Sequence, residues 1–105
     1  SGDDITFLDY LKKGGKAVIA VTANVRPLMM HEICNLVKEN KIEDAEKLNQ
    51  KLELLHKAMF IESNPIPVKW MLTKMGLIQQ YIRLPLVELD PSNTKILNEG
   101  YKLSE

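Results

Sequence analysis

The sequence predicts a mostly helical α/β chain in which one buried strand lies between two helices and is followed by helices alone. Three observations predict this class. Residues 17–21 form an unbroken run of small and β-branched apolar side chains, which is typical of a strand buried on both faces of a parallel sheet. Apolar side chains recur three and four residues apart between residues 27 and 61, as in amphipathic helices. Proline and glycine divide the rest into short segments.

The first predicted elements are a short helix and the strand. The acidic pair Asp3-Asp4 can cap the helix at its positive end, and Gly14-Gly15 supplies the left-handed stop that most residues resist. The apolar face of this helix consists of Phe7, Leu8 and Leu11. The strand Ala17–Val21 follows the glycine turn, and Thr22 to Asn24 leads into the next helix.

Two longer amphipathic helices are predicted over residues 27–40 and 43–61. Pro27 can occupy the first turn of the earlier helix, where its missing N–H has no effect on hydrogen bonding. The apolar stripe of that helix is Met30, Ile33, Cys34 and Val37. The later helix has the stripe Ala45, Leu48, Leu52, Leu55 and Met59, with the i, i+4 charge pairs Glu43/Lys47 and Glu53/Lys57 outside it.

The last third of the chain predicts a short helix, a connector and a terminal helix. Asn64 is expected to cap the short helix, which takes two prolines in its first turn and stops at Gly76. Its buried side chains are expected to be Val68, Met71, Leu72 and Met75. Residues 79–89 are predicted to be an extended connector, and Asp90 or Ser92 is expected to cap the terminal helix.

Composition and charge disfavour several classes of protein. Lys plus Arg equals Asp plus Glu at 14 each, so no net field attracts the chain to nucleic acid or to an anionic membrane. No apolar run approaches the ~20 residues that cross a bilayer. Cys34 is the only cysteine, which suits a reducing compartment. The sequence therefore predicts a cytoplasmic chain without nucleic-acid or membrane partners.

The residues alone offer few candidates for chemistry. His31 and His56 lie on different predicted helices with no partner at ligand spacing, so no metal site is predicted and both are expected at the surface or its boundary. Cys34 is expected to be an inert core thiol. Lys69 is the lysine that most merits attention as an imine former, although a packed or ion-paired side chain is the favoured interpretation. No cofactor is predicted.

Three segments taken together indicate a known family: Ser1–Asp4, Gly15–Val25 and Asn64–Trp70. Asn49, Leu55-His56, Gly76-Leu77 and Arg83-Leu84-Pro85 add to them. In order and spacing these segments resemble dihydrodipicolinate synthases, and the resemblance extends from Ser1 to at least Leu86. Its most specific part is the run Asn-Pro-Ile-Pro-Val-Lys-Trp.

The resemblance implies a (β/α)8 TIM barrel with a C-terminal helical extension. Residues 1–41 would then be the end of the barrel, comprising the loop after strand 7, strand 8 and helix 8. Residues 42–105 would form the helical extension. Because such a barrel takes at least ~200 residues, the chain is expected to be the C-terminal part of an enzyme and inactive alone. Its unpaired strand edges would favour association with the missing half or with another copy.

The resemblance also implies a lyase reaction of lysine biosynthesis, in the diaminopimelate pathway. A lysine forms a Schiff base with pyruvate, and the enamine attacks aspartate semialdehyde to give 4-hydroxy-tetrahydrodipicolinate. That lysine would lie upstream of Ser1, so no catalytic residue is assigned here. Substrate contacts are expected at Ile19, Gly2 and Asp3, braced by Thr22 and Asn24. The full-length enzyme is expected to be a homotetramer.

Two other interpretations stay open. A related pyruvate aldolase, such as a sialate or keto-sugar lyase, would share the barrel and the Schiff base, although the Asn64–Lys69 motif argues against it. A free-standing helical interaction module, whose apolar faces bind a partner, would have no use for a buried strand.

Overall fold

The computed structural model describes residues 1–105 and consists of helices and connecting segments, with no assigned strand. The α-helices are α1 (Phe7–Lys12), α2 (Pro27–Lys38), α3 (Ile42–Ala58), α4 (Ile66–Lys74) and α5 (Thr94–Leu103), and the 3-10 helices are η1 (Thr22–Asn24) and η2 (Pro91–Asn93). The molecule is elongated, at 42 × 24 × 21 Å. None of its helices combines the length and apolar character needed to span a bilayer.

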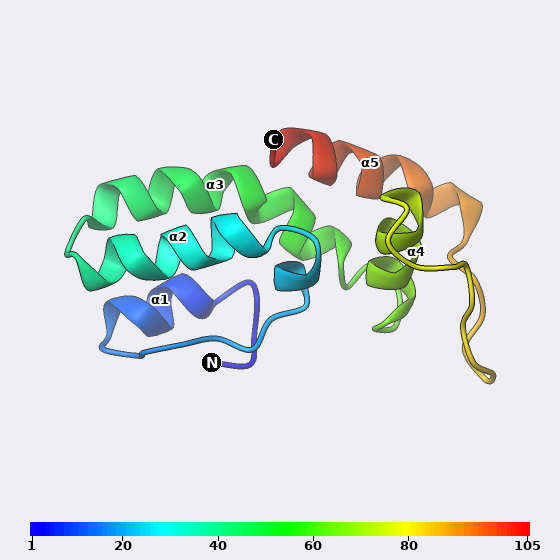
Figure 1. Ribbon diagram of the computed structural model, residues 1–105, viewed down its shortest axis with the longest axis horizontal. Coiled ribbons are helices and arrows are strands. Elements are labelled where there is room, and N and C mark those ends of the chain that lie inside the picture. The colour runs from blue at the N-terminus through cyan, green and yellow to red at the C-terminus, as the bar shows by residue number, and fades with distance from the viewer.

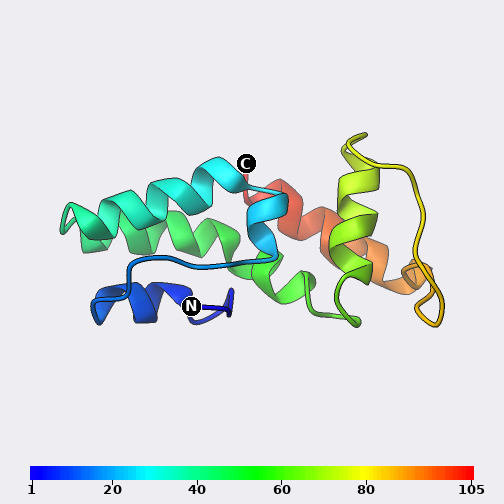
Figure 2. The same cartoon turned by 60° about the horizontal axis from the view of Figure 1, so that its bottom comes forward.

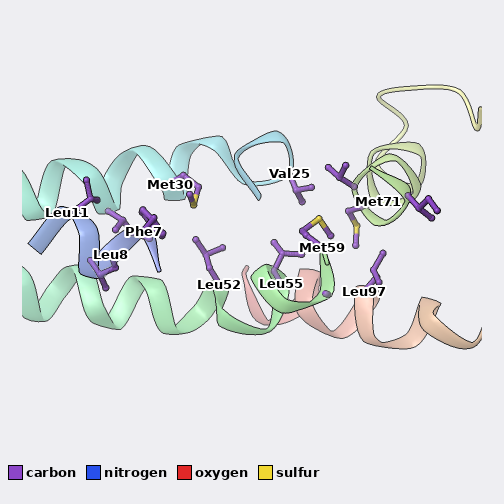
Figure 3. Packing of buried hydrophobic residues seen from close by; sticks show 14 of the residues in the cluster. Phe7, Leu8, Leu11, Val25, Met30, Leu52, Leu55, Met59, Met71 and Leu97 are labelled. Carbon is purple, nitrogen blue, oxygen red and sulfur yellow. The ribbon is translucent and has the colours of Figure 1, made fainter. Parts of the chain in front are cut away.

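Helix α3 is the centre of the fold (Figure 1). It runs antiparallel to α2, and α5 lies along its C-terminal half, with α1 and α4 at opposite ends of the molecule. Figure 3 shows a continuous row of buried apolar side chains along these helices, from Leu11 near one end to Met71 near the other. Leu52 and Leu55 of α3 are fully buried in the middle of this row. The long helix predicted from the apolar spacing is thus the element that the others cover.

The predicted helices over residues 27–40 and 43–61 are present as α2 and α3, with Pro27 in the first turn of α2 and a Glu53–Lys57 ion pair of 3.1 Å. Asn40 has a positive φ of 63° and follows the end of α2, and Gly76 has a φ of 76° and follows α4. Both conformations are the left-handed turn that commonly ends a helix. The stop predicted at Gly76 is therefore confirmed.

The strand predicted over Ala17–Val21 is not found. Residues 15–20 form an extended segment without assigned secondary structure (Figure 2), and Val21 already has helical angles, φ −68° and ψ −45°. The terminal amine of Ser1 donates to the carbonyl of Ala17 at 2.8 Å, and the N–H of Ile19 donates to the carbonyl of Ser1 at 2.8 Å. These two bonds have the pattern of a parallel pair, but one residue is too short a partner to define a strand.

Several predicted caps and buried positions also differ. Asn64 does not cap α4, which starts after Pro65 without a side-chain cap. Asp90 does accept a hydrogen bond from the N–H of Ser92 at 2.9 Å, but it caps η2, which precedes α5. Cys34 is only half-buried, and this burial raises the pKa of its thiol. An inert thiol at the margin of the core fits these facts better than a fully buried one.

Large apolar side chains remain exposed, most of them in two parts of the chain. In the N-terminal loop, the extended segment and the first turn of α2 they are Ile5, Ile19 and Leu28, and in the loop after α4 they are Leu77, Ile78, Tyr81, Leu84 and Val87. Exposed apolar groups in such number are typical of surfaces that contact further protein. The expectation that this chain associates with another polypeptide came from the edges of the predicted strand, and these two regions are a separate reason for it.

Candidate functional site

The predicted substrate contacts lie at the margin of the molecule formed by the N-terminal loop and the extended segment. Ser1 and Ile19 share a backbone hydrogen bond, so Gly2 and Ile19 are brought close together although 17 positions separate them in the sequence. Gly2 and Asp3 are exposed, and 89% of Ile19 is exposed. All three residues are therefore exposed in this chain.

Burial alternates along the extended segment. Val18 and Ala20 are partly buried against the core, whereas Ala17 and Ile19 are exposed. A period of two means that one set of side chains faces the helices and the other points away from them. Ile19 therefore projects from the face opposite the helices, the face that would be the interior of a helix-covered barrel.

Asp3 has a local structural role in addition to its predicted one. Its carboxylate accepts hydrogen bonds from the N–H of Thr6 at 3.1 Å and from the Thr6 hydroxyl at 2.5 Å. Thr6 immediately precedes α1, and no side chain caps that helix, so the cap predicted for the acidic pair is not found and the Asp3 carboxylate holds the turn before α1 instead. A contact between Asp3 and substrate stays a prediction.

Asp4 does not cap α1 but forms a buried link to the end of the extended segment. Only 1% of Asp4 is exposed. One carboxylate oxygen accepts from the N–H of Val21 at 3.1 Å, and the other accepts from the N–H and the hydroxyl of Thr22, each at 2.7 Å. Thr22, which the sequence suggested as a brace, is fully buried. Asn24 is exposed and bonds only the carbonyl of Val21.

His56 is the residue that sequence reasoning misplaced, because it is buried and not at the surface or boundary. It is 2% exposed on α3, with its Nδ1 2.8 Å from the Thr22 hydroxyl. The ring of Phe7 packs against it edge-on at 5.8 Å. A signal was present in the spacing, since Asn49, Leu52, His56 and Met59 recur three and four residues apart. The buried face of α3 is wider than a single stripe because other helices cover it from more than one side.

The hydrogen-bond network fixes where its protons lie. The Asp4 carboxylate can only accept, so the single hydroxyl proton of Thr22 points to it. Thr22 must then accept from Nδ1–H of His56, which leaves Nε2 as an acceptor. The side-chain oxygen Oδ1 of Asn49 lies 3.2 Å from Nε2, so Nε2 gains a donor only when the Asn49 amide is turned to bring its NH2 group to the ring. In that orientation His56 is neutral.

Acid should weaken the fold through His56. Burial lowers the pKa of this imidazole, against the opposing attraction of Asp4, Asp3 and Glu53. A lowered pKa means that the unfolded chain binds the proton more readily than the folded chain does. The contribution of His56 to the free energy of unfolding is therefore fully present above about pH 6.5, the ordinary pKa of histidine. It is lost as the pH falls through the lower pKa of the folded chain. Urea unfolding of wild type and His56→Asn between pH 5 and 8 measures this. The stability difference should shrink on acidification, and a difference that grows instead would refute it.

A second set of contacts joins the start of α2 to the C-terminus. Arg26 donates from Nε to the Ser104 hydroxyl at 2.8 Å and from Nη2 to the Tyr101 carbonyl at 3.2 Å. Its guanidinium also lies 4.1 Å from the centre of the Tyr101 ring. The last turn of α5 is thereby held against the segment that follows η1, close to the network around Thr22.

The structure is that of a mostly helical chain in which Ser1 makes two backbone hydrogen bonds of parallel pattern to the extended segment. Residues 1–102 match the Dihydrodipicolinate synthetase family. The chain belongs to that family.

Relatives with known names agree with this assignment. The 4-hydroxy-tetrahydrodipicolinate synthase of Methylococcus capsulatus is 53% identical over 102 residues, which are 97% of this chain and 35% of that protein. The synthase of Saccharophagus degradans is 52% identical over 90 residues, which are 86% of this chain and 31% of that protein. The chain thus spans about a third of the length of the curated relatives that it matches.

Solved structures show the same correspondence. The chloride-inhibited dihydrodipicolinate synthase of Acinetobacter baumannii, complexed with pyruvate, superposes with a TM-score of 0.93 at 42% identity. The superposition covers 99% of this chain and 36% of that one. The fold of the present chain is therefore that of one part of a dihydrodipicolinate synthase.

Proposed function

We propose that this chain is the C-terminal third of a lyase that condenses pyruvate with aspartate semialdehyde to 4-hydroxy-tetrahydrodipicolinate in lysine biosynthesis. The observation that carries the proposal is the family match over residues 1–102. The names of the relatives favour this activity over a sialate or keto-sugar aldolase and over a helical interaction module. Residues 1–41 would be the end of the barrel, and residues 42–105 would be the helical extension.

The chain would contribute part of the wall of the pyruvate site. Ile19 offers an apolar surface and Gly2 an unobstructed backbone, since a Cβ at Gly2 would meet no atom within 4 Å. An apolar wall keeps water away from a Schiff base and its enamine, which protects them from hydrolysis. Asp3 would lie at the rim of the site. Its carboxylate is engaged by Thr6, so its backbone is the part free to meet a substrate.

The imine-forming lysine would come from the rest of the enzyme. A lysine that forms an imine needs a dry pocket that favours its neutral amine. Lys69 is only partly buried, in α4, and it is in the helical extension and not beside Gly2 and Ile19. It is better explained as a packed surface side chain. The chain alone would therefore be inactive.

The exposed apolar surfaces suit the proposed assembly. The face around Ile5, Ile19 and Leu28 would be covered by the remaining strands and helices of the barrel, which closes the strand edges left open here. The full-length enzyme would be a cytoplasmic homo-oligomer, by analogy a tetramer. A solved relative is described as the first monomeric dihydrodipicolinate synthase variant, so oligomeric state varies among proteins that share this fold.

Steady-state kinetics of the full-length protein that contains this sequence tests the proposal. Purified protein should consume pyruvate and aspartate semialdehyde together and should leave pyruvate unchanged when N-acetylmannosamine is the only acceptor. Turnover with the sugar but not with the semialdehyde would favour the sialate lyase. No pyruvate turnover with either acceptor would refute the proposed function.

A further inference from the structure

We infer that His56 is a positioning residue for the proposed pyruvate site. It acts through Thr22 on the carboxylate of Asp4. That carboxylate ties the loop that carries Gly2 to the end of the segment that carries Ile19. The inference rests on the proposed function, because these residues are substrate contacts only under that proposal.

The His56 ring is held in one orientation by three neighbours. Its Nδ1 lies 2.8 Å from the Thr22 hydroxyl, and its Nε2 lies 3.2 Å from the side-chain oxygen Oδ1 of Asn49. The edge-on ring of Phe7, at an interplanar angle of 77°, restricts it from a further side. Because these neighbours come from η1, α3 and α1, the ring links the helical extension to both segments beside the site.

His56 determines which way the Thr22 hydroxyl points. The hydroxyl has one proton, and with Nδ1–H donating to its oxygen that proton is directed to Asp4. Hydrogen bonds in series strengthen one another in a buried environment, and here both Thr22 and Asp4 are almost completely shielded from water. Without the imidazole, the hydroxyl loses its donor, and its bond to Asp4 weakens.

The site residues lie between two cross-links. At one end, Ser1 bonds to Ala17 and Ile19 through the backbone. At the other end, Asp4 bonds to Val21 and Thr22. The loop that carries Gly2 is held at both ends, and weakening the Asp4 link leaves it held at only one. A shift of this loop changes the contact that it makes with pyruvate, and the KM for pyruvate reports such a change.

The expected kinetic signature separates positioning from stability. The imine-forming lysine lies elsewhere under the proposal, so the loop contacts pyruvate without taking part in proton transfer. Loss of a contact made equally in the ground state and the transition state raises KM and leaves kcat unchanged. A residue that only stabilised the fold would lower the melting temperature without changing the pyruvate KM of the folded enzyme.

The test compares three variants in the full-length enzyme. His56→Leu removes the Nδ1–H donor, whereas His56→Asn can place an amide N–H near the same position. Gln50→Leu is the matched control, because Gln50 is exposed on the same helix. His56→Leu should raise the KM for pyruvate about tenfold and change kcat less than about twofold. His56→Asn and Gln50→Leu should both stay within about twofold of wild type.

A second variant keeps the inference testable if His56→Leu fails to fold. Thr22→Val preserves the shape of the side chain and removes only the hydroxyl, so it should raise the pyruvate KM to a similar extent. If His56→Leu folds and its KM for pyruvate is unchanged, the inference is overturned and the proposed function still stands. If only Thr22→Val folds, an unchanged KM for pyruvate in that variant has the same meaning. A wild-type enzyme that does not turn over pyruvate would overturn both.

Discussion

Replacing Asp4 with alanine should lower the free energy of unfolding of this chain by about 3–5 kcal/mol. The substitution leaves the N–H of Val21 and both the N–H and the hydroxyl of Thr22 without their acceptor. Hydrogen bonds to a charged group contribute about 1.5–3 kcal/mol each, and a buried donor left unpaired costs about 1–3 kcal/mol. Local relaxation recovers part of that sum, so the net loss is smaller than three full bonds.

Urea denaturation followed by circular dichroism measures this loss. Asp4→Asn keeps one carbonyl oxygen as an acceptor and should lose about half as much stability. Asp9→Ala is the control, because Asp9 is an exposed carboxylate on α1 and its removal should change stability by less than about 0.5 kcal/mol. Equal effects of Asp4→Ala and Asp9→Ala would show that the buried link contributes nothing.

Placing leucine at Gly100 should separate α3 from α5 and destabilise the chain by about 1–2 kcal/mol. A Cβ at this position would lie 3.0 Å from the Cα of Leu55 and 3.1 Å from its backbone nitrogen. Backbone atoms cannot move aside as a flexible side chain can, so the two helices must shift apart. Overpacking of this kind costs about 1–3 kcal/mol or more, and the better helix propensity of leucine offsets about 1 kcal/mol of it.

Asn98→Leu is the matched control for this change. Asn98 is exposed on α5 only two positions away, so the same side chain should change stability by less than about 0.5 kcal/mol there. Thermal and urea unfolding of both variants give the comparison. A Gly100→Leu variant as stable as Asn98→Leu would contradict the close approach of α3 and α5.

Local sequence patterns predicted the helices well because their causes are local. The apolar spacing from Met30 to Met59 reflects the helical repeat, and Gly76 ends α4 through its own left-handed conformation. Each signal needs only the neighbouring residues.

The sequence could not predict features that depend on distant partners. The apolar run Ala17–Val21 has the composition of a strand, but a strand also needs a neighbour along its length, and only Ser1 pairs with it here. The partner of Asp4 lies 18 positions away at Thr22, so adjacency to Asp3 suggested a cap instead of a buried link. The burial of His56 follows from how α1 and η1 cover α3, and its only local signal was the spacing that His56 shares with Leu52 and Met59.

The candidate site was predicted only from the family resemblance. Gly2, Asp3 and Ile19 carry no distinctive pattern, and an exposed isoleucine beside a glycine has many ordinary explanations. The structure adds that the loop carrying Gly2 is bonded to Ile19 through Ser1 and that Ile19 projects from the face opposite the helices. Their contact with substrate stays a prediction that kinetics on the full-length enzyme can test.

The central claim is that this chain supplies part of a pyruvate site but not the lysine that forms the Schiff base. Intact-mass spectrometry after incubation with pyruvate and borohydride tests it most directly. The chain is measured alone and then mixed with a polypeptide covering the other part of the Methylococcus capsulatus relative, of which this chain matches 35%. The account predicts no adduct on this chain in either sample and an adduct on the added polypeptide in the mixture. A reduced adduct on this chain, with Lys69 as the first residue to map, would contradict it.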